Sequence, residues 1–312
     1  MSAFNSIPAW LNANSNSFAP PVCNRLMHGP DGQLFVMYVG GPNQRKDFHL
    51  EEGEELFYME KGDMCLRVLE QGVFRDIEIK EGEVFLLPGK IPHSPQRFKD
   101  TVGLVIERQR TEKEEDCIRY FMEGLPNILF ERWIHCTNLG TQIAPIISEY
   151  FASEEHETGK PSENSVVHNP PFYPDADRKL GNPFSIVQWL EENKDKMTEN
   201  GKVRMFDESY QTDVFVVGGA QSTTFPANNT AEYWIWQFRG ESDLVLDEGD
   251  SSDLLSRHYH LHEHCSYLVP VGQGFSLQPP TREAGSGHTI IVSMDPNNKE
   301  RSRSKIYSLV IA

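Results

Sequence analysis

The sequence contains little cysteine and none of it in pairs. Its five cysteines are odd in number and scattered, and no two of them form a Cys-x-x-Cys motif. A disulfide framework needs an even set at regular spacing, and a thiolate zinc site needs paired cysteines. Neither kind of site is therefore expected. Free thiols are typical of a reducing compartment, so we expect the cytosol.

Positive charge is also scarce. The chain has 29 Lys and Arg against 46 Asp and Glu, which gives a formal net charge of −17. A field of this sign repels phosphate backbones and anionic lipid headgroups, so we expect neither a nucleic-acid partner nor a membrane partner. No stretch approaches the roughly 18 consecutive apolar residues of a membrane span, and the start lacks a basic segment followed by an apolar one. We expect a soluble protein that acts on a small molecule.

Short β-rich runs separated by Gly and Pro are abundant. In the first half they cover residues 34–39, 55–60, 64–70, 73–79, 84–87 and 102–108. A second series covers residues 214–219, 232–238, 243–248, 257–262, 267–272, 275–279, 288–294 and 305–312. Helical spacing of apolar residues predicts only two helices, at 140–152 and 185–197. The fold class is therefore all-β, as barrels or sandwiches with a few peripheral helices.

The second β-rich series repeats the first. With Gly240 aligned on Gly62 and Pro270 on Pro88, the runs of the two halves correspond in residue type, which suggests a duplicated barrel. The 312-residue length is about twice that of an average domain. A polar stretch with four prolines, 153–181, indicates a linker draped over the surface. We expect an N-terminal catalytic barrel at 1–160, a linker at 161–181 and a C-terminal barrel at 182–312.

Two segments of the first half space His and Glu as a metal site would. They are Gly41-x5-Asp47-x-His49-x5-Glu55-x6-Gly62 and Gly82-x5-Pro88-x4-His93-x3-Arg97. Two imidazoles and one carboxylate can occupy one face of an octahedral ion and leave the opposite positions open for substrate and O2. This set favours Fe(II), although affinity order alone admits Co, Ni, Cu or Zn. A lone His on a strand is more often structural than a ligand, but the combined spacing favours a metal site.

Both segments resemble the motifs of the cupin superfamily, G-x5-H-x-H-x3,4-E-x6-G and G-x5-P-x-G-x2-H-x3-N. Three departures are visible. Asp47 stands where the first histidine of the pair would be, the His-to-Glu gap is one or two residues longer, and Arg97 replaces the terminal Asn. The resemblance implies two cupin, or jelly-roll, barrels in one chain.

The wider pattern resembles the animal-type 3-hydroxyanthranilate 3,4-dioxygenase family. QRKDFHLEEGEELFYMEKGD, VFLLPGKIPHSPQRF and VGLVIERQR carry the resemblance, which is specific over residues 24–110 and looser elsewhere. It implies a non-haem Fe(II)-dependent dioxygenase that opens the ring of 3-hydroxyanthranilate with O2 by extradiol-type cleavage. The implied product is 2-amino-3-carboxymuconate semialdehyde, the quinolinate precursor on the kynurenine route to NAD.

The resemblance also implies roles for six residues. They are the metal ligands His49, Glu55 and His93 and the pocket residues Arg45, Arg97 and Glu107. Arg97 would clamp the substrate carboxylate, Glu107 would accept a hydrogen bond from the amine, and Arg45 would stabilise charge on reduced O2. Glu55 would also border the substrate. Without the resemblance, Arg45 and Arg97 would be ordinary surface ion-pair residues, and Glu107 a solvated strand-end residue.

The second half carries a histidine-rich segment that imitates a metal cluster. In RHYHLHEH, four histidines fall on one strand face: His258, His260, His262 and His264. The repeat offset places the first three on Asp76, Glu78 and Lys80, which belong to the polar face of a strand in the first half. We therefore favour a solvent-exposed face over a metal site.

The ligand positions themselves are not repeated. The same offsets align His93 with Phe275, Glu55 with Tyr233 and His49 with Ala227, and none of these three counterparts can bind iron. The C-terminal barrel is expected to be a degenerate copy without a metal site that covers the first barrel, so we expect a monomer. Two alternatives stay open: a cupin dioxygenase or metal-dependent isomerase acting on another substrate, and a non-catalytic cupin binding module.

Overall fold

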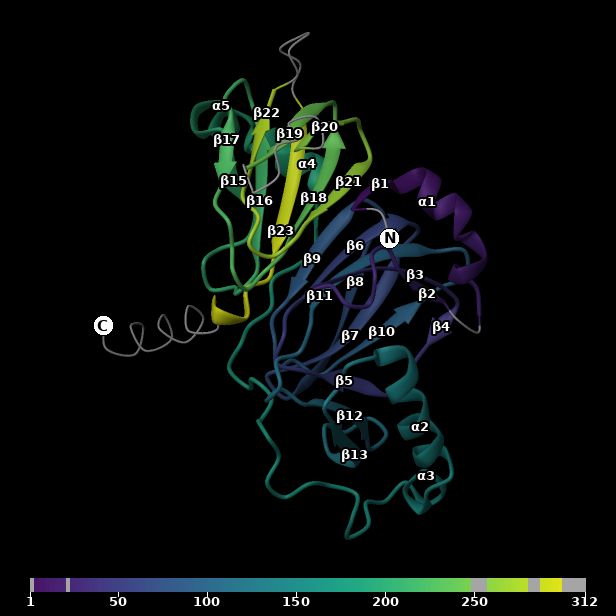
Figure 1. Ribbon diagram of the computed structural model, residues 1–312. Helices are drawn as coiled ribbons and strands as arrows, with labels where there is room; N and C mark the ends of the chain where they lie inside the picture. Colours follow the sequence, from purple (N-terminus) through teal and green to yellow (C-terminus); the bar gives the residue numbers. More distant parts are fainter. Residues whose placement is uncertain (1–2, 21–22, 248–256, 280–286, 299–312) are drawn as a thin grey trace, which may run out of the picture. The chain divides into compact units, whose positions relative to one another are not determined.

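The computed structural model describes residues 3–20, 23–247, 257–279 and 287–298 (Figure 1). Antiparallel strands dominate these residues and the helices are short, which confirms the all-β class. The strand expected at 305–312 lies outside the described residues. Within them, no helix combines the length and the apolar character needed to cross a membrane.

The chain divides into two compact units. The first barrel comprises Ser17–Arg25 and Tyr38–Ser185, and the second barrel comprises Met1–Asn16, Leu26–Met37 and Ile186–Ala312. These bounds differ from the expected ones at the N-terminus, because β1 (Phe4–Ser6) pairs with β21 (Cys265–Val269) in the second barrel. Early residues of the sequence thus complete a sheet formed mainly by late ones.

Two antiparallel sheets form the first barrel. One has the order β13-β12-β5-β10-β7-β8, with β4 paired to β10. Its strands are β4 (Asn43–Gln44), β5 (Phe48–Leu50), β7 (Met64–Glu70), β8 (Val73–Ile79), β10 (His93–Arg97), β12 (Asp116–Phe121) and β13 (Ile128–Ile134). The other sheet has the order β14-β9-β6-β11-β3-β2. Its strands are β2 (Asn24–Leu26), β3 (Leu34–Gly40), β6 (Glu55–Lys61), β9 (Glu83–Leu87), β11 (Val102–Arg108) and β14 (Phe184–Ser185). The last residue of β2 and residues 34–37 of β3 are assigned to the other compact unit.

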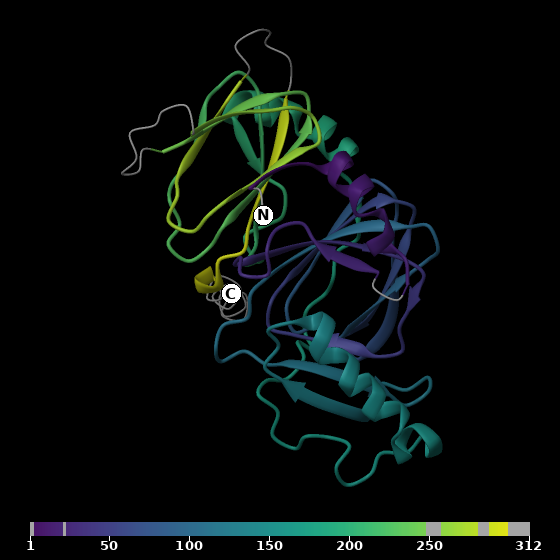
Figure 2. The same cartoon turned by 45° about the vertical axis from the view of Figure 1, so that its right-hand side comes forward.

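Alternation of side chains along each strand builds the core. In β7, Met64, Leu66 and Val68 are buried while the residues between them are partly or fully exposed, as period-two packing requires. The predicted helix at 140–152 is confirmed as α2 (Leu139–Phe151). Its Ile143, Ile146 and Tyr150 pack against apolar residues of β12 and β13. Figures 1 and 2 both show α2 alongside these two strands.

The proline-rich segment that follows is attached to the first barrel. After the short helix α3 (Glu154–Thr158), residues 159–183 form no helix or strand. The backbone N–H of Asp175 donates to the Lys90 carbonyl at 2.8 Å, and that of Leu180 donates to Glu70 Oε1 at 2.6 Å. Phe172 is buried beside Leu50 and Cys117. The segment therefore covers part of the barrel wall.

The second barrel repeats the two-sheet arrangement. One sheet has the order β1-β21-β18-β23-β16-β15, with β15 (Lys202–Arg204), β16 (Asp213–Gly218), β18 (Tyr233–Arg239) and β23 (His288–Ser293). The other has the order β17-β22-β19-β20, with β17 (Thr223–Phe225), β19 (Ser242–Leu246), β20 (His258–Leu261) and β22 (Phe275–Gln278). Three helices accompany the sheets: α1 (Ile7–Ala13), α4 (Ile186–Glu192) and α5 (Lys194–Asn200). The single helix expected at 185–197 is thus divided in two, and the break falls at Asn193.

Aromatic side chains fill the interior of the second barrel. Phe275 is fully buried and stacks on Phe225, with ring centroids 4.9 Å apart. Tyr233 meets the Phe275 ring edge-on at 5.3 Å. The counterparts of His93 and Glu55 are therefore core residues that pack against each other.

Candidate metal centre

The three predicted ligands converge inside the first barrel from both of its sheets. His49 on β5 and His93 on β10 lie opposite each other on neighbouring strands. Glu55 is the first residue of β6 in the other sheet. All three are buried, and their potential ligand atoms lie within 4.8 Å of one another.

Two glycines of the sequence motif shape the strand connections around this cluster. Gly62 follows β6 with φ of 67°, and Gly82 precedes β9 with φ of 79°. These left-handed conformations are easily adopted only by glycine. The turns bring β6 and β9 together in a register that pairs Glu55 with Leu87. The spacing of the motif therefore reflects the turns that hold Glu55 in the interior.

Each histidine has one ring nitrogen bonded to the protein and the other turned toward Glu55. His93 Nδ1 is 3.0 Å from the Ile91 carbonyl, and its Nε2 is 2.6 Å from Glu55 Oε1. His49 Nε2 is 2.8 Å from Asp116 Oδ2, and its Nδ1 is 3.8 Å from Glu55 Oε1. A hydrogen bond that fixes one ring nitrogen leaves the other free to bind metal, and it is typical of metal-bound histidines.

The donor set fits a divalent ion. Glu55 Oε1 is buried, and it contacts His93 Nε2, the ring nitrogen that is not bonded to the backbone, at 2.6 Å. Burial raises the pKa of Glu55, but the interactions with His93 and then with His49 lower it by more than burial raises it. The pKa of Glu55 therefore lies below its usual value. Burial lowers the pKa of His93, and Glu55 raises it above its usual value. The carboxylate is thus held ionised, the state that binds a cation.

Arg97 enters the same interior from β10. It lies four residues after His93 on β10, so both side chains point to the same face. Arg97 is 3% exposed, and its Nη1 has no hydrogen-bond partner among the described residues. Gly103 on β11 makes room, because a Cβ there would lie 2.8 Å from Nη1. Burial, with Arg45 adding repulsion, lowers the pKa of Arg97 to about 10.

Glu107 and Arg45 are already paired with other side chains. Glu107 on β11 is 2% exposed and forms an ion pair with Arg110, so the solvated alternative for this residue is wrong. Burial raises the pKa of Glu107, while Arg110 opposes the rise. Arg45 donates from Nε to Asp47 at 3.1 and 3.2 Å. Asp47, which replaces the first histidine of the cupin motif, therefore determines where Arg45 points.

Arg45 also lines a cleft in the first barrel. The cleft has a volume of about 770 Å³, and Lys46, Arg67, Phe48 and Tyr120 contribute to its wall. The three predicted metal ligands do not line it. Acidic Asp76 and Glu123 also line the cleft, and Asp76 forms an ion pair with Arg67.

Sequence reasoning missed a buried charge network behind His49. Arg110 Nη2 is 2.8 Å from both Glu51 Oε2 and Asp116 Oδ2. Burial raises the pKa of Asp116, but the hydrogen bond to His49 and the charge of Arg110 bring it below its usual value. Of these residues, only Glu51 could have been found from the sequence, because it lies two residues after His49 and its side chain should point to the same side of the chain.

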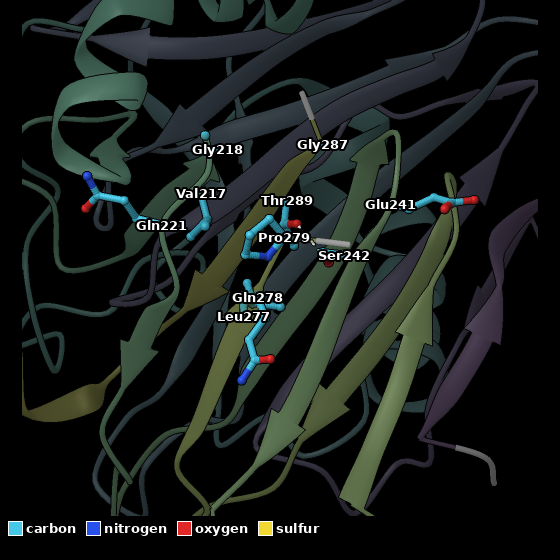
Figure 3. Close-up of a pocket in the computed structure, with 11 residues that line it drawn as sticks. Val217, Gly218, Gln221, Glu241, Ser242, Leu277, Gln278, Pro279, Gly287 and Thr289 are labelled. Carbon is cyan, nitrogen blue, oxygen red and sulfur yellow. Dashed lines mark hydrogen bonds between the residues drawn. The ribbon is translucent and has the colours of Figure 1, made fainter. Parts of the chain in front are cut away.

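A second group of potential ligands lies in the second barrel. Glu241, His260 and His262 place their ligand atoms within 4.8 Å of one another, and all three are exposed. The four histidine side chains of the segment are 41–62% exposed, which confirms the solvent-exposed face. A nearby depression is lined by Val217, Ser242, Leu277 and Thr289, and Glu241 is the only charged residue described in its wall (Figure 3).

The architecture and the ligand geometry define a class, the double-barrel cupins with one His, Glu, His centre. The family model for 3-hydroxyanthranilic acid dioxygenase matches residues 2–151. The 3-hydroxyanthranilate 3,4-dioxygenase of Homo sapiens is 48% identical over 294 residues, which cover 94% of this chain and 97% of that protein. The enzyme of the same name from Nematostella vectensis is 51% identical over 277 residues, which cover 89% and 94%. The chain belongs to the 3-hydroxyanthranilate 3,4-dioxygenase family and is an oxygenase.

A solved structure of oxalate decarboxylase from Bacillus subtilis at pH 4.6 is also similar to this chain. The similarity covers 85% of this chain and 68% of that chain, with 14% identity and a TM-score of 0.44.

Proposed function

We propose that this enzyme cleaves the ring of 3-hydroxyanthranilate with O2, using Fe(II) bound by His49, Glu55 and His93. The proposal is carried by the convergence of two imidazoles and one buried carboxylate within 4.8 Å. The substrate follows from the relatives, which are named for this reaction. The bond between the hydroxyl-bearing ring carbon and its unsubstituted neighbour breaks, and each carbon gains one oxygen atom. The ring is oxidised and O2 is reduced, so no external reductant is needed.

The protein residues bind and orient the reactants. When bound, ferrous iron supplies open coordination positions for O2 and the aminophenol and transfers electrons between them. The residues that would hold the ion are His49, Glu55 and His93, which reach it from both sheets of the barrel. Asp116 holds the His49 ring in place through the 2.8 Å hydrogen bond.

Arg97 is proposed to bind the carboxylate of the substrate. Its buried Nη1 lacks a hydrogen-bond partner among the described residues, and an anion would supply one. Charge-assisted bonds between guanidinium and carboxylate can be bidentate, so they fix orientation as well as position. Since His93 and Arg97 share one strand face, the clamp sets which ring edge faces the metal.

Glu107 and Arg45 are proposed to act at the other edges of the substrate. Glu107 shares its face of β11 with Gly103, beside which the Arg97 guanidinium lies. A carboxylate there can accept a hydrogen bond from the substrate amine while Arg110 holds its other side. Arg45 is proposed to stabilise negative charge on reduced oxygen.

The remaining assignments concern the whole chain. We propose that the first barrel alone is catalytic and that the interior of the second holds no metal, since aromatic rings occupy the corresponding positions. We also propose that the protein is a monomer and that it is cytosolic, and the five free thiols support the cytosolic location. Gel filtration with light scattering tests the monomer, and a stable dimer would contradict it. Cell fractionation tests the location, and recovery from an organelle would contradict that.

Anaerobic loading with Fe(II), followed by O2 uptake with and without 3-hydroxyanthranilate, tests the function. We expect one O2 consumed per substrate and none without substrate. His49→Ala should lose bound iron and activity together, whereas the control His168→Ala, at an exposed position, should keep both. A His49→Ala protein that keeps one iron per chain would overturn the ligand assignment. Faster turnover of another aminophenol or a catechol in a substrate panel would overturn the substrate.

A further inference from the structure

The antiparallel pairing of β19 with β20 brings three potential metal-binding side chains together on the outside of the second barrel. Glu241 directly precedes β19, His260 lies on β20, and His262 follows its last residue. The proposed dioxygenase reaction uses none of them.

The two distances from the Glu241 carboxylate to the imidazoles are close to those between ligand atoms of one metal ion. Glu241 Oε1 is 3.2 Å from His262 Nδ1, and Glu241 Oε2 is 3.4 Å from His260 Nε2. Two donors bound at roughly 2.0–2.1 Å to one tetrahedral zinc ion lie about 3.3 Å apart. The two imidazoles pack edge to face, with centroids 4.5 Å apart. An ion can therefore join the three side chains without a rearrangement of the strands.

A fourth residue orients one of the imidazoles. Asp243 lies opposite His260 in the β19–β20 register, and its Oδ1 is 2.8 Å from His260 Nδ1. If Nδ1 donates its proton to Asp243, the lone pair of Nε2 faces the Glu241 carboxylate. Either a proton on Nε2 or a metal ion between the two groups satisfies both. The same arrangement of carboxylate, imidazole and second carboxylate surrounds His49 in the first barrel.

Charge and access also favour a cation here. The side chains of Glu241, His260 and His262 are 50%, 41% and 62% exposed, so an ion can enter from solvent and keep water ligands. Asp243 is 13% exposed and adds a second negative charge beside the cluster. Figure 3 shows the Glu241 carboxylate directed away from Pro279 and Thr289, although Glu241 also borders the neighbouring depression.

We propose that Glu241, His260 and His262 form a second, surface site for a divalent transition ion, with Zn²⁺ as its representative, and that Asp243 orients His260. Nitrogen and oxygen donors in this proportion suit Zn²⁺ and comparable ions rather than Mg²⁺ or Ca²⁺. The site does not depend on the proposed ring cleavage, because it shares no residue with the first barrel.

Zinc binding to the iron-loaded, tag-free protein tests the site. Under anaerobic conditions, calorimetric titration with ZnCl₂ and metal analysis after dialysis should show one zinc per chain beyond the iron. His260→Gln and His262→Gln should each weaken this binding by more than about 10-fold, because even residues that only orient ligands contribute roughly 10- to 100-fold. His264→Gln is the matched control: this neighbouring exposed histidine is outside the cluster, and its loss should change nothing.

Two further variants separate the site from the first barrel and test the role of Asp243. His49→Ala should still take up the surface zinc. Asp243→Asn should lower zinc affinity by roughly 10- to 100-fold without changing the stoichiometry. The proposal is overturned if no zinc binds beyond the first-barrel metal. It is also overturned if His260→Gln and His262→Gln, shown by circular dichroism to be folded, bind zinc as the parent does.

Discussion

Arg97→Met should stabilise the protein while weakening its use of substrate. Arg97 is 3% exposed, and burial lowers its pKa from 12.5 to about 10. At about 1.4 kcal/mol per pKa unit, the charged side chain costs the folded state roughly 3 kcal/mol. Because the folded pKa lies below the unfolded one, this cost is fully present at neutral pH and falls only as the pH rises through about 10. Methionine removes the charge and keeps much of the packed volume.

The same substitution removes the proposed partner of the substrate carboxylate. Loss of a charge-assisted hydrogen bond should raise the activation free energy that corresponds to kcat/KM by about 1.5–3 kcal/mol, which lowers kcat/KM roughly 10- to 150-fold. Urea unfolding with an unchanged m-value, iron analysis and steady-state kinetics measure the three quantities separately. Arg25→Met, at an exposed position, is the matched control and should alter none of them. A destabilised Arg97→Met protein, or one with unchanged kcat/KM, would refute the reasoning.

Three further predictions concern neighbouring and peripheral residues. Asp116→Asn removes the carboxylate that fixes His49, so chelator competition should show iron affinity reduced by roughly 10- to 100-fold, and an unchanged affinity would argue against this role. Gly103→Ala places a Cβ 2.8 Å from Arg97 Nη1, so KM should rise while bound iron is retained, and loss of iron would contradict this. Hydrogen bonds from two serine hydroxyls lower the pKa of Glu155 from 4.5 to about 2. Glu155→Gln should therefore lower the free energy of unfolding in urea by about 1 kcal/mol at pH 7. The difference should disappear as the pH falls from about 4.5 toward 2, and a difference that persisted at pH 2 would contradict this role of Glu155.

Strands without functional residues were predictable from alternation alone. The runs at 64–70 and 73–79 coincide with β7 and β8. Of the three strands that carry the ligands, β6 was predicted from the run at 55–60. The other two were not, because β5 reads FHL and β10 reads HSPQR. In these two strands, metal ligands and a proline occupy positions where apolar residues would otherwise produce the alternation that identifies a strand. Local sequence rules fail where a strand must supply chemistry as well as packing.

The ligands themselves could be predicted, because a fixed spacing of His, Glu and Gly records the turns that bring them together. The network around Arg110 could not. Residues 107–116 are almost all charged, and such a run is normally solvated. Here Glu107, Arg110 and Asp116 are buried because their opposite charges compensate one another. That compensation depends on contacts between segments, which no local pattern encodes.

The pairing of β1 with β21 imposes an order on the folding of the nascent chain. Ser6 is matched with Cys265, about 260 positions later. At about 5–20 residues per second, the ribosome needs roughly 13–50 s to deliver the partner strand after the first one has been made. During that interval the opening residues have no sheet to join, whereas the strands of the first barrel are already complete. A nascent chain should therefore acquire its metal-binding half well before its N-terminus is anchored.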